Sequence, residues 1–579
     1  MNAVDTTSNP PHNGNVARRL TDMAAQMPDA TAVVEPLGYG PGGRRKYRQV
    51  SFRELDQDSD RISAGLWELG AKEGTRLALL VRPGIDFVSL AFGLLKSGAV
   101  AILIDPGMGR KNLVRCLAEA EPEGFVAIAM VHAVRSILRR RFPKAAFNVT
   151  VGRRWFWGGP TLAGLRRRRW PGTSIAATTG DDPAAIIFTT GSTGPPKGVL
   201  YRHGNFGAQV EQIRDRYGIR PGEIDLPGFP LFGLFNCAMG VTAVIPDMDP
   251  SRPAMVNPRN ILEAAGDWQV TQTFGSPAIW NRVGRYCEEH GARLATVRRV
   301  LSAGAPVPAP VLDRMRRHIA PEGELHTPYG ATEALPVASI SASEVLGDFV
   351  EQPPVESSEL APTAAQGTAH RTRQGAGVCV GTRFSGIEWK VIRIVDGPLA
   401  SLADVEELPV GEIGELIVRG PQVTREYVTR VEANALAKIV DGDSVWHRMG
   451  DTGYLDEQER FWFCGRVAHR VLTEQGPLYP VRCEAIFNEH PDVFRSALVG
   501  VGPPGRQRPV IVVELHADCA PSTAEEESLL LGELHDRGGA NPLTKPVSEF
   551  LIHPAFPVDI RHNSKIFREK LARWAADKL

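Results

Sequence analysis

The strongest constraint on the fold is an alternation of helix-length amphipathic segments with short apolar runs through the first two-thirds of the chain. Residues 52–70 place Leu55, Ile62, Leu66 and Leu69 roughly at helical spacing, and the apolar run "RLALLVRP" follows. A second helical segment, "GIDFVSLAFGLLKSG", then leads into the run "AVAILIDP". Such alternation is typical of parallel strands joined by crossover helices. The sequence therefore predicts an α/β fold with helix-covered sheets.

The length of the chain, 579 residues, predicts more than one domain. The composition changes after "GRVAHRV", and we expect a domain boundary there that separates residues 1–466 from a compact tail over residues 467–579. Residues 341–377 are rich in Pro, Ser, Ala, Thr and Gly. Their composition fits a long surface excursion better than a core element.

The net charge gives no reason to expect a nucleic acid or an anionic membrane as partner, because Lys+Arg and Asp+Glu both total 66. The arginines are nevertheless uneven, since "RSILRRRF" and "LRRRRW" make residues 135–170 locally basic. Two interpretations stay open for this region. It is either a solvated face or a docking surface for a partner or for lipid headgroups.

The cysteines, the polar N-terminal segment and the lack of a long apolar stretch predict a cytoplasmic protein. Seven cysteines are scattered singly, with no close pairing, which is typical of reduced thiols rather than a disulfide frame or a zinc site. The polar start "MNAVDTTSNPPHNGN" is unlike a secretory signal. No apolar stretch reaches the ~18 residues that crossing a bilayer requires.

A loop within "AAIIFTTGSTGPPKGVLYRH" (residues 184–203) has the chemistry of a phosphate site. Gly191 and Gly194 permit backbone angles at which successive N–H groups point inward, and Lys197 adds a mobile positive charge. Further hydroxyl donors come from Thr189, Thr190, Ser192 and Thr193. The spacing is not that of a Walker A loop, because two residues separate the glycines and Gly198 follows the lysine.

This loop resembles the phosphate-binding signature of the adenylate-forming superfamily, which comprises acyl-CoA synthetases, luciferases and peptide-synthetase adenylation domains. Five other segments resemble further motifs of the superfamily, in family order: "LLKSGAVAILIDP" (94–106), "SAGAPVP" (302–308), "YGATE" (329–333), "GDTGYLDEQERFWFCGR" (450–466) and "NSKIFREKL" (563–571). The resemblance covers almost the whole chain. It implies a large N-terminal AMP-binding domain of several subdomains and a small mobile α+β lid.

The resemblance also implies ATP and Mg²⁺ as cofactors and gives each motif a role. Contacts to adenine, AMP and phosphate are expected from Gly304, Ala305, Pro306, Tyr329, Gly330 and Thr332. Glu333, a hard oxygen ligand, would hold Mg²⁺, and Asp451 would accept hydrogen bonds from the ribose hydroxyls. Arg466 completes the AMP-binding set. Lys565 and Lys197 are the expected catalytic cations, with Thr332 and Glu333 as the other catalytic residues.

Several positions depart from the superfamily pattern where thioester-forming members bind CoA. Gly233 stands where a histidine is common, and the hinge residue Ala468 stands where Asp or Lys is usual. Leu472 lies near the position where members of the superfamily usually have a lysine, and Ser564 stands where they usually have a glycine before the lysine that corresponds to Lys565. These departures favour a second half-reaction that does not use CoA.

Longer phrases, such as "DLPGFPLFGLFNCAMGVTAVIPDMDPSRPA" and "FPVDIRHNSKIFREKLA", resemble the β-lactone-forming branch of the superfamily, which acts in bacterial long-chain olefin biosynthesis. That branch implies a 2-alkyl-3-hydroxy fatty acid whose own β-hydroxyl attacks the adenylate. Candidate pocket residues are Phe232, Gly233, Phe235 and His203. Ordinary core packing, and a structural hydrogen bond for His203, are the alternatives.

Two other functions remain open from the sequence. The first is a long-chain fatty-acyl-CoA ligase or fatty-acyl-AMP ligase, which would pass the same adenylate to CoA or to a carrier protein. The second is an inactive adenylate-binding scaffold, which the joint presence of Lys197, Glu333, Asp451, Arg466 and Lys565 disfavours. The resemblance implies other enzymes of the olefin pathway as candidate partners, besides the small acid substrate.

Overall fold

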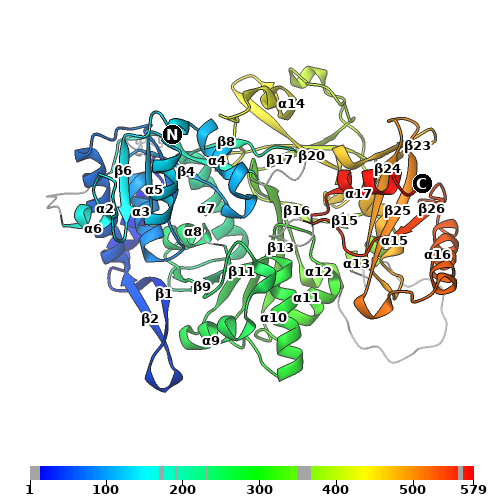
Figure 1. The fold of residues 1–579 in the computed structure, drawn as a ribbon, viewed down its shortest axis with the longest axis horizontal. Coiled ribbons are helices and arrows are strands. Elements are labelled where there is room, and N and C mark those ends of the chain that lie inside the picture. Colours follow the sequence, from blue (N-terminus) through cyan, green and yellow to red (C-terminus); the bar gives the residue numbers. More distant parts are fainter. Residues whose placement is uncertain (1–13, 168–174, 190–193, 230, 348–366, 559–564) are drawn as a thin grey trace, which may run out of the picture. The chain divides into compact units, whose positions relative to one another are not determined.

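The computed structural model of the protein describes residues 14–167, 175–189, 194–229, 231–347, 367–558 and 565–579 (Figure 1). The chain divides into two compact units. Unit 1 comprises Met1–Thr190, Pro196–Asp247 and Pro421–Val431. Unit 2 comprises Gly191–Pro195, Met248–Gly420 and Glu432–Leu579.

Unit 1 contains a six-stranded sheet in the order β6-β5-β3-β4-β7-β8. Its strands are β3 (Arg76–Leu80), β4 (Val100–Leu103), β5 (Gly124–Ile128), β6 (Phe147–Val151), β7 (Pro183–Phe188) and β8 (Gly198–Arg202). All neighbours are parallel except β7 and β8, which form an antiparallel pair. Helices α2 (Phe52–Glu68) and α3 (Ile85–Lys96) follow the predicted pattern, and a capping box of Ser51 and Glu54 begins α2. The predicted α/β architecture is confirmed.

Alternation along the strands explains how this sheet is covered on both faces. Ala78 and Ile102 pack against Cys116 and Leu117 of α4 (Arg110–Glu119). Leu77, the neighbour of Ala78, points to the other face and is also buried. Unit 1 also contains strands in the order β9-β10-β1-β2. They are β1 (Thr31–Tyr39), β2 (Arg45–Ser51), β9 (Ile224–Pro227) and β10 (Thr242–Val244), and α8 (Phe232–Ala238) connects β9 to β10.

Unit 2 contains strands in the order β11-β12-β13-β14-β16. They are β11 (Gln272–Gly275), β12 (Arg299–Ser302), β13 (Glu324–Ala331), β14 (Ala334–Ser341) and β16 (Thr382–Arg383). Strands β11, β12 and β13 are mutually parallel, whereas β13 and β14 form an antiparallel hairpin. The carboxyl ends of the parallel strands therefore lie at one edge.

A separate antiparallel sheet of unit 2 carries two of the predicted site residues. Its order is β15-β21-β20-β18-β17, and β19 pairs with β20. The strands are β15 (Val378–Cys379), β17 (Glu388–Ile392), β18 (Gly414–Arg419), β19 (Lys438–Asp441), β20 (Ser444–Leu455) and β21 (Phe461–Arg466).

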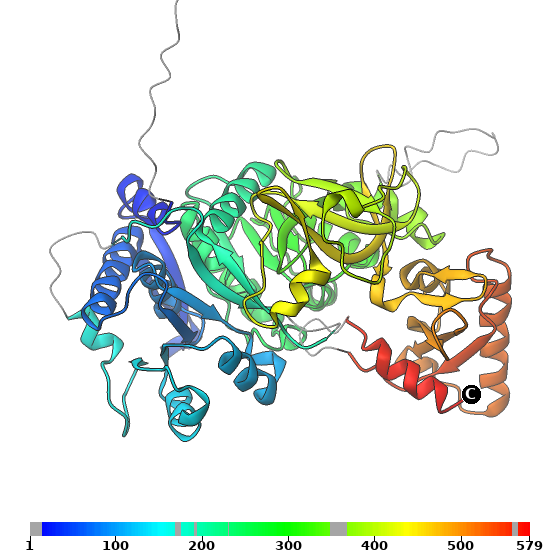
Figure 2. The ribbon, with the colours of Figure 1, turned by 90° about the horizontal axis from the view of Figure 1, so that it is seen from above.

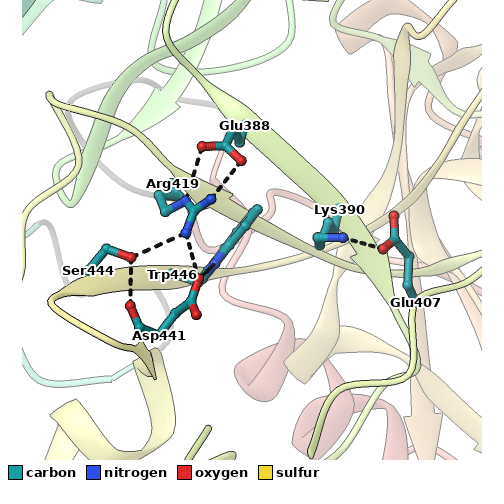
Figure 3. A network of polar contacts seen from close by, with 7 residues as sticks. All are labelled: Glu388, Lys390, Glu407, Arg419, Asp441, Ser444 and Trp446. Atoms are coloured by element: carbon teal, nitrogen blue, oxygen red, sulfur yellow. Dashed lines mark hydrogen bonds and ion pairs between the residues drawn. The ribbon is translucent and has the colours of Figure 1, made fainter. Parts of the chain in front are cut away.

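One arginine ties the strands of this sheet together. Arg419 lies with its guanidinium carbon 4.8 Å from the centroid of the Trp446 ring. It donates to Glu388 on β17, at 2.8 and 3.1 Å, and to Asp441 on β19, at 2.5 Å (Figure 3). One planar guanidinium on β18 therefore joins β17 to β19, two strands that do not pair with each other, within the sheet that carries Asp451 and Arg466.

The C-terminal part of unit 2 is a three-stranded sheet with helices on both faces (Figure 2). The elements are β24 (Val493–Val501), β25 (Arg508–Leu515), β26 (Glu549–Ile552), α15 (Pro480–Phe487), α16 (Ala524–Gly539) and α17 (Arg568–Ala576). Leu498 and Ile511 pack with Phe487 of α15 and Leu534 of α16. The alternate positions of the same strands, such as Val499 and Val510, pack with Leu571 of α17.

The predicted boundary after Arg466 lies within unit 2, where β21 ends and the single turn η7 (Val467–His469) begins. The strand pair β22 (Val471–Thr473) and β23 (Gly476–Leu478) follows. The predicted excursion over residues 341–377 contains one short helix near each end, α12 (Ala342–Leu346) and α13 (Thr368–Arg373), and residues 348–366 lie outside the described part. Within the described residues, no helix combines the length and apolarity needed to cross a membrane.

Candidate active site

The predicted phosphate loop joins β7 to β8 in unit 1. Thr189 and Lys197 close its base, because the Thr189 N–H donates to the Lys197 carbonyl at 3.0 Å. The Lys197 N–H in turn donates to Thr189 Oγ1 at 3.1 Å. Gly194 is exposed. The predicted residues Thr190, Gly191, Ser192 and Thr193 lie outside the described residues.

A distant segment of unit 1 holds Lys197 in place. The Lys197 ammonium lies 4.6 Å from the centroid of the buried Tyr427 ring, a cation–π contact. The next residue, Gly198, donates its N–H to Thr429 Oγ1 at 2.7 Å. Both contacts fix the exit of the loop, so the lysine is orientated before any ligand binds.

In unit 2, Thr332 and Glu333 form the two-residue turn of the β13–β14 hairpin. Ala331 and Ala334 pair on either side of them. Gly330 is required just before the turn, since a Cβ there would lie 2.7 Å from the Ala334 carbonyl oxygen. The hairpin therefore carries a hydroxyl and a carboxylate together at its tip.

Asp451 is the most constrained of the predicted site residues. The Tyr329 hydroxyl donates to its Oδ2 at 2.5 Å, and Arg466 Nη1 lies 2.8 Å from its Oδ1. Asp451 and Arg466 face each other directly across β20 and β21. Arg466 Nη1 also donates to the Met449 carbonyl at 2.8 Å. The structure thus brings Tyr329, Asp451 and Arg466 together from three strands.

Burial dominates the electrostatics of this trio. Asp451 is only 5% exposed, and desolvation raises the pKa of its carboxyl, opposed by the neighbouring Arg466. The Glu333 carboxylate also raises the pKa of Asp451, so the hairpin tip lies within electrostatic reach. Burial, followed by the negative charge of Asp451, raises the pKa of Tyr329 well above its usual value. Tyr329 therefore keeps its proton and remains a donor.

The segment predicted to contact adenine leaves the sheet at the same edge. Strand β12 runs parallel to β13 and ends at Ser302. Gly304 then adopts a φ of 96°, which a side chain would disfavour, and Ala305 and Pro306 follow. Crevices at the carboxyl ends of parallel strands are common ligand sites in α/β proteins.

Glu333 is the candidate metal ligand. Within the described part of the chain, no group of three or more His, Cys, Asp or Glu side chains is placed to hold a metal ion. A single carboxylate beside a hydroxyl fits Mg²⁺, which is usually held by one or two carboxylates together with substrate phosphates and water. It does not fit a metal held in an all-protein cage.

The hinge and the C-terminal lysine lie in unit 2. Ala468 is the middle residue of η7, beside His469, whose Nε2 is 3.5 Å from Glu569 Oε1 at the start of α17. Burial and the nearby Arg568 lower the pKa of His469 to about 3. Lys565 directly precedes Ile566, which forms a bridge with Val558 just before α17 begins.

The predicted pocket residues lie on and beside α8 in unit 1. Phe232 and Phe235 are half-buried, with ring centroids 5.8 Å apart, and Phe206 lies 6.2 Å from Phe235. Gly233 is buried, and a Cβ at this position would contact only aliphatic carbons, those of Ala243, Val88 and Ile245. The site offers an apolar aromatic surface.

His203 is completely buried at the start of α7 (His203–Tyr217). Its Nδ1 accepts a hydrogen bond from the Val16 N–H at 3.2 Å. Burial lowers the pKa of His203 to about 4, although Asp182 acts in the opposite direction. This structural hydrogen bond is the alternative that the sequence left open, and contact with substrate stays a prediction.

Comparisons with known proteins agree with this arrangement. The family profile described as AMP-binding enzyme matches residues 20–428. The olefin beta-lactone synthetase of Stenotrophomonas maltophilia is 46% identical over 573 residues, which is 98% of each chain. The enzyme of the same name from Xanthomonas campestris pv. campestris is 44% identical, over 97% of this chain and 98% of the other.

The chain belongs to the AMP-binding enzyme family. Solved structures support the fold of this AMP-binding enzyme. The amide bond synthetase of Marinactinospora thermotolerans matches with a TM-score of 0.74 at 21% identity, over 97% of this chain and 99% of the other. An anthranilate CoA ligase in complex with anthranoyl-AMP matches with a TM-score of 0.74 at 19% identity, over 99% of both chains. The predicted family is confirmed.

Some residues of this AMP-binding enzyme brace the site from a distance and could not be found from the sequence. Tyr427 and Thr429 lie in "VTREYVTR", which carries no motif and lies more than two hundred residues after the loop that it contacts. Met449 accepts a hydrogen bond from Arg466 through its backbone carbonyl. This role gives no sequence signal, because every residue has a carbonyl.

The burial of His203 predicts that the stability of the fold depends on pH. Its pKa is about 4 in the folded chain and near 6.5 when unfolded, so the unfolded chain binds more protons between these values. Stability should be fully present above pH 6.5 and should fall, by roughly 3 kcal/mol for this residue, as the pH drops to 4. Denaturant unfolding at several pH values should show that the free energy of unfolding falls less steeply with decreasing pH in His203→Gln than in the parent chain.

The matched control is His535→Gln, at a histidine whose side chain is 63% exposed. This variant should keep the pH dependence of the parent chain. An unchanged profile for His203→Gln would contradict the assignment of a buried, neutral imidazole.

Proposed function

We propose that the protein activates a long-chain 2-alkyl-3-hydroxy fatty acid as its acyl-adenylate and then closes a β-lactone, releasing AMP and pyrophosphate. The observation that carries the proposal is the 46% identity, over 98% of each chain, to a protein named olefin beta-lactone synthetase. The Tyr329–Asp451–Arg466 trio supports it, since a buried carboxylate at the end of the sheet suits a ribose diol.

In the first half-reaction, a carboxylate oxygen of the substrate attacks the α-phosphorus of ATP and pyrophosphate leaves. Lys197, orientated by Tyr427, would neutralise phosphate oxygens, and Lys565 would bridge the carboxylate and the α-phosphate. Thr332 would donate its hydroxyl to phosphate. Glu333 would hold Mg²⁺, which when bound neutralises charge on the phosphates.

In the second half-reaction, the β-hydroxyl oxygen attacks the acyl carbonyl carbon. The bond from that carbon to the AMP oxygen breaks, its electron pair leaves with AMP, and the released AMP or water takes up the hydroxyl proton. Because the nucleophile is already part of the substrate, the protein needs only to hold it in a reactive conformer and to exclude water. The half-buried rings of Phe232 and Phe235 would bind the alkyl chains.

The surroundings of Gly233 support an internal nucleophile over CoA. A histidine at this position in thioester-forming relatives would need polar partners, but here the Cβ direction meets aliphatic carbons at 3.8–4.0 Å. A buried imidazole among such carbons would lack hydrogen bonds. Residues 467–579, which follow Arg466 and begin with the Ala468 turn, would act as the lid that carries Lys565.

The alternative is a ligase that passes the same adenylate to CoA or to a carrier protein. Relatives with such names are more distant: an acyl-CoA ligase of Aspergillus fumigatus is 23% identical over 82% of this chain. The two functions share the adenylate and differ only in the nucleophile.

Products distinguish the two functions directly. The protein, ATP and Mg²⁺ should convert a 2-alkyl-3-hydroxy acid, without CoA, into AMP and a product lighter than the acid by one water. Mass spectrometry of incubations with and without CoA provides the measurement, with a simple fatty acid as the matched substrate. Acyl-CoA formation with no lactone from either acid would assign the alternative function.

The role of Lys565 predicts a selective loss of adenylation. Lys565→Ala should lower substrate-dependent pyrophosphate exchange by about a hundredfold or more, because the developing charge at the α-phosphate loses its partner. The control is Lys570→Ala, which removes a lysine of α17 that contacts the Phe567 ring and should leave exchange unchanged. Undiminished exchange in Lys565→Ala would remove this lysine from the mechanism.

A further inference from the structure

One part of unit 1 is strongly basic although the whole chain is neutral. Residues 124–180 contain ten arginines and one lysine but neither Asp nor Glu. The described part of this stretch includes β5, α5 (Ala129–Ile137) and β6, the edge strand of the six-stranded sheet (Figure 1). None of the steps proposed above uses it.

Helix α5 exposes a row of apolar side chains. Met130, Val134 and Ile137 are 61%, 46% and 81% exposed, and their spacing of four and three residues places them on one face. The opposite face is anchored, since His132 is buried and its Nε2 lies 3.0 Å from the Val149 carbonyl on β6. The apolar face of α5 therefore points away from its own sheet.

The loop after β6 exposes two aromatic rings and packs against α5 through Trp157. Trp155 is 50% exposed and Phe156 is 76% exposed. The buried Trp157 holds the loop: its ring lies 5.6 Å from that of His132 on α5, and its Nε1 donates to Thr150 Oγ1 at 2.9 Å. A rigid anchor thus presents two large apolar side chains outward.

Exposed arginines lie close in the sequence to these side chains. Arg139, Arg140 and Arg141 form the turn η3, one residue after α5 ends, and Arg153 lies two residues before Trp155; all four are exposed. Within the described part of the chain, none of the four makes an ion pair with a carboxylate. Their charges are therefore available to an anionic partner.

We propose that this basic apolar surface, formed by Met130, Val134, Ile137, Trp155, Phe156, Arg139–Arg141 and Arg153, docks the protein on an anionic lipid bilayer. An exposed apolar helix face with arginines beside it and with Trp and Phe nearby is the pattern of a segment that lies in the membrane interface. An acidic protein would satisfy the arginines but would give no reason for Ile137 and Phe156 to remain in water. If the proposed function holds, docking also brings the site to the membrane, into which long-chain acids partition.

Vesicle flotation tests the surface without substrate or ATP, so its outcome is independent of the proposed reaction. The full chain should float with vesicles of phosphatidylglycerol and phosphatidylethanolamine and not with phosphatidylcholine alone. About 0.5 M NaCl should release it, because salt screens the arginines. Arg139→Gln combined with Arg140→Gln should weaken binding by about fivefold for each arginine removed.

Ile137→Glu should abolish flotation, and the matched control Leu529→Glu, at a 66% exposed leucine of α16, should leave it unchanged. Both changes replace one exposed apolar side chain by a carboxylate, so a general effect of charge would affect both. Equal loss in both variants, or no binding to the anionic vesicles, would overturn the proposal. Binding to poly-glutamate without binding to vesicles would overturn it in favour of an acidic protein partner.

Discussion

The candidate site of unit 2 depends on one buried carboxylate. Asp451 is held between the Tyr329 hydroxyl and the Arg466 guanidinium, and the three residues come from β13, β20 and β21. A buried charge that loses its partner costs about 3–5 kcal/mol, so neither partner can be removed without consequence. The register of β20 against β21 is therefore coupled to the site, because a slip by one residue would turn Arg466 to the opposite face.

Features that depend on neighbouring residues could be predicted from the sequence, whereas contacts between distant segments could not. Helix α2 was predictable because its capping box and its apolar spacing are local signals, and β3 and β4 are short runs that only a covered sheet accommodates. The contact of Lys197 with Tyr427 was not predictable, because it joins residues far apart in the chain through a ring that serves no local pattern. For His203, only the structure identifies a buried partner, the N–H of Val16.

Once the adenylate has formed, the proposed reaction needs no second substrate. Where the nucleophile belongs to the substrate, a second binding step and the polar groups that would recognise CoA have no use. The aliphatic surroundings of Gly233 and the half-buried aromatic rings beside it agree with a site that lacks such polar groups. The basic apolar surface around α5 would bring the protein to a lipid bilayer, which is where a long-chain substrate concentrates.

Oxygen isotopes follow the proposed reaction most directly. A substrate labelled with heavy oxygen at both carboxylate positions should give AMP that carries one labelled oxygen and a lactone that keeps the other, because the β-hydroxyl displaces AMP from the acyl carbon. The measurement is mass spectrometry of AMP and lactone after a single turnover. Unlabelled AMP together with a lactone that retains both labelled oxygens would contradict the account, since ATP would then have activated the hydroxyl and not the carboxylate.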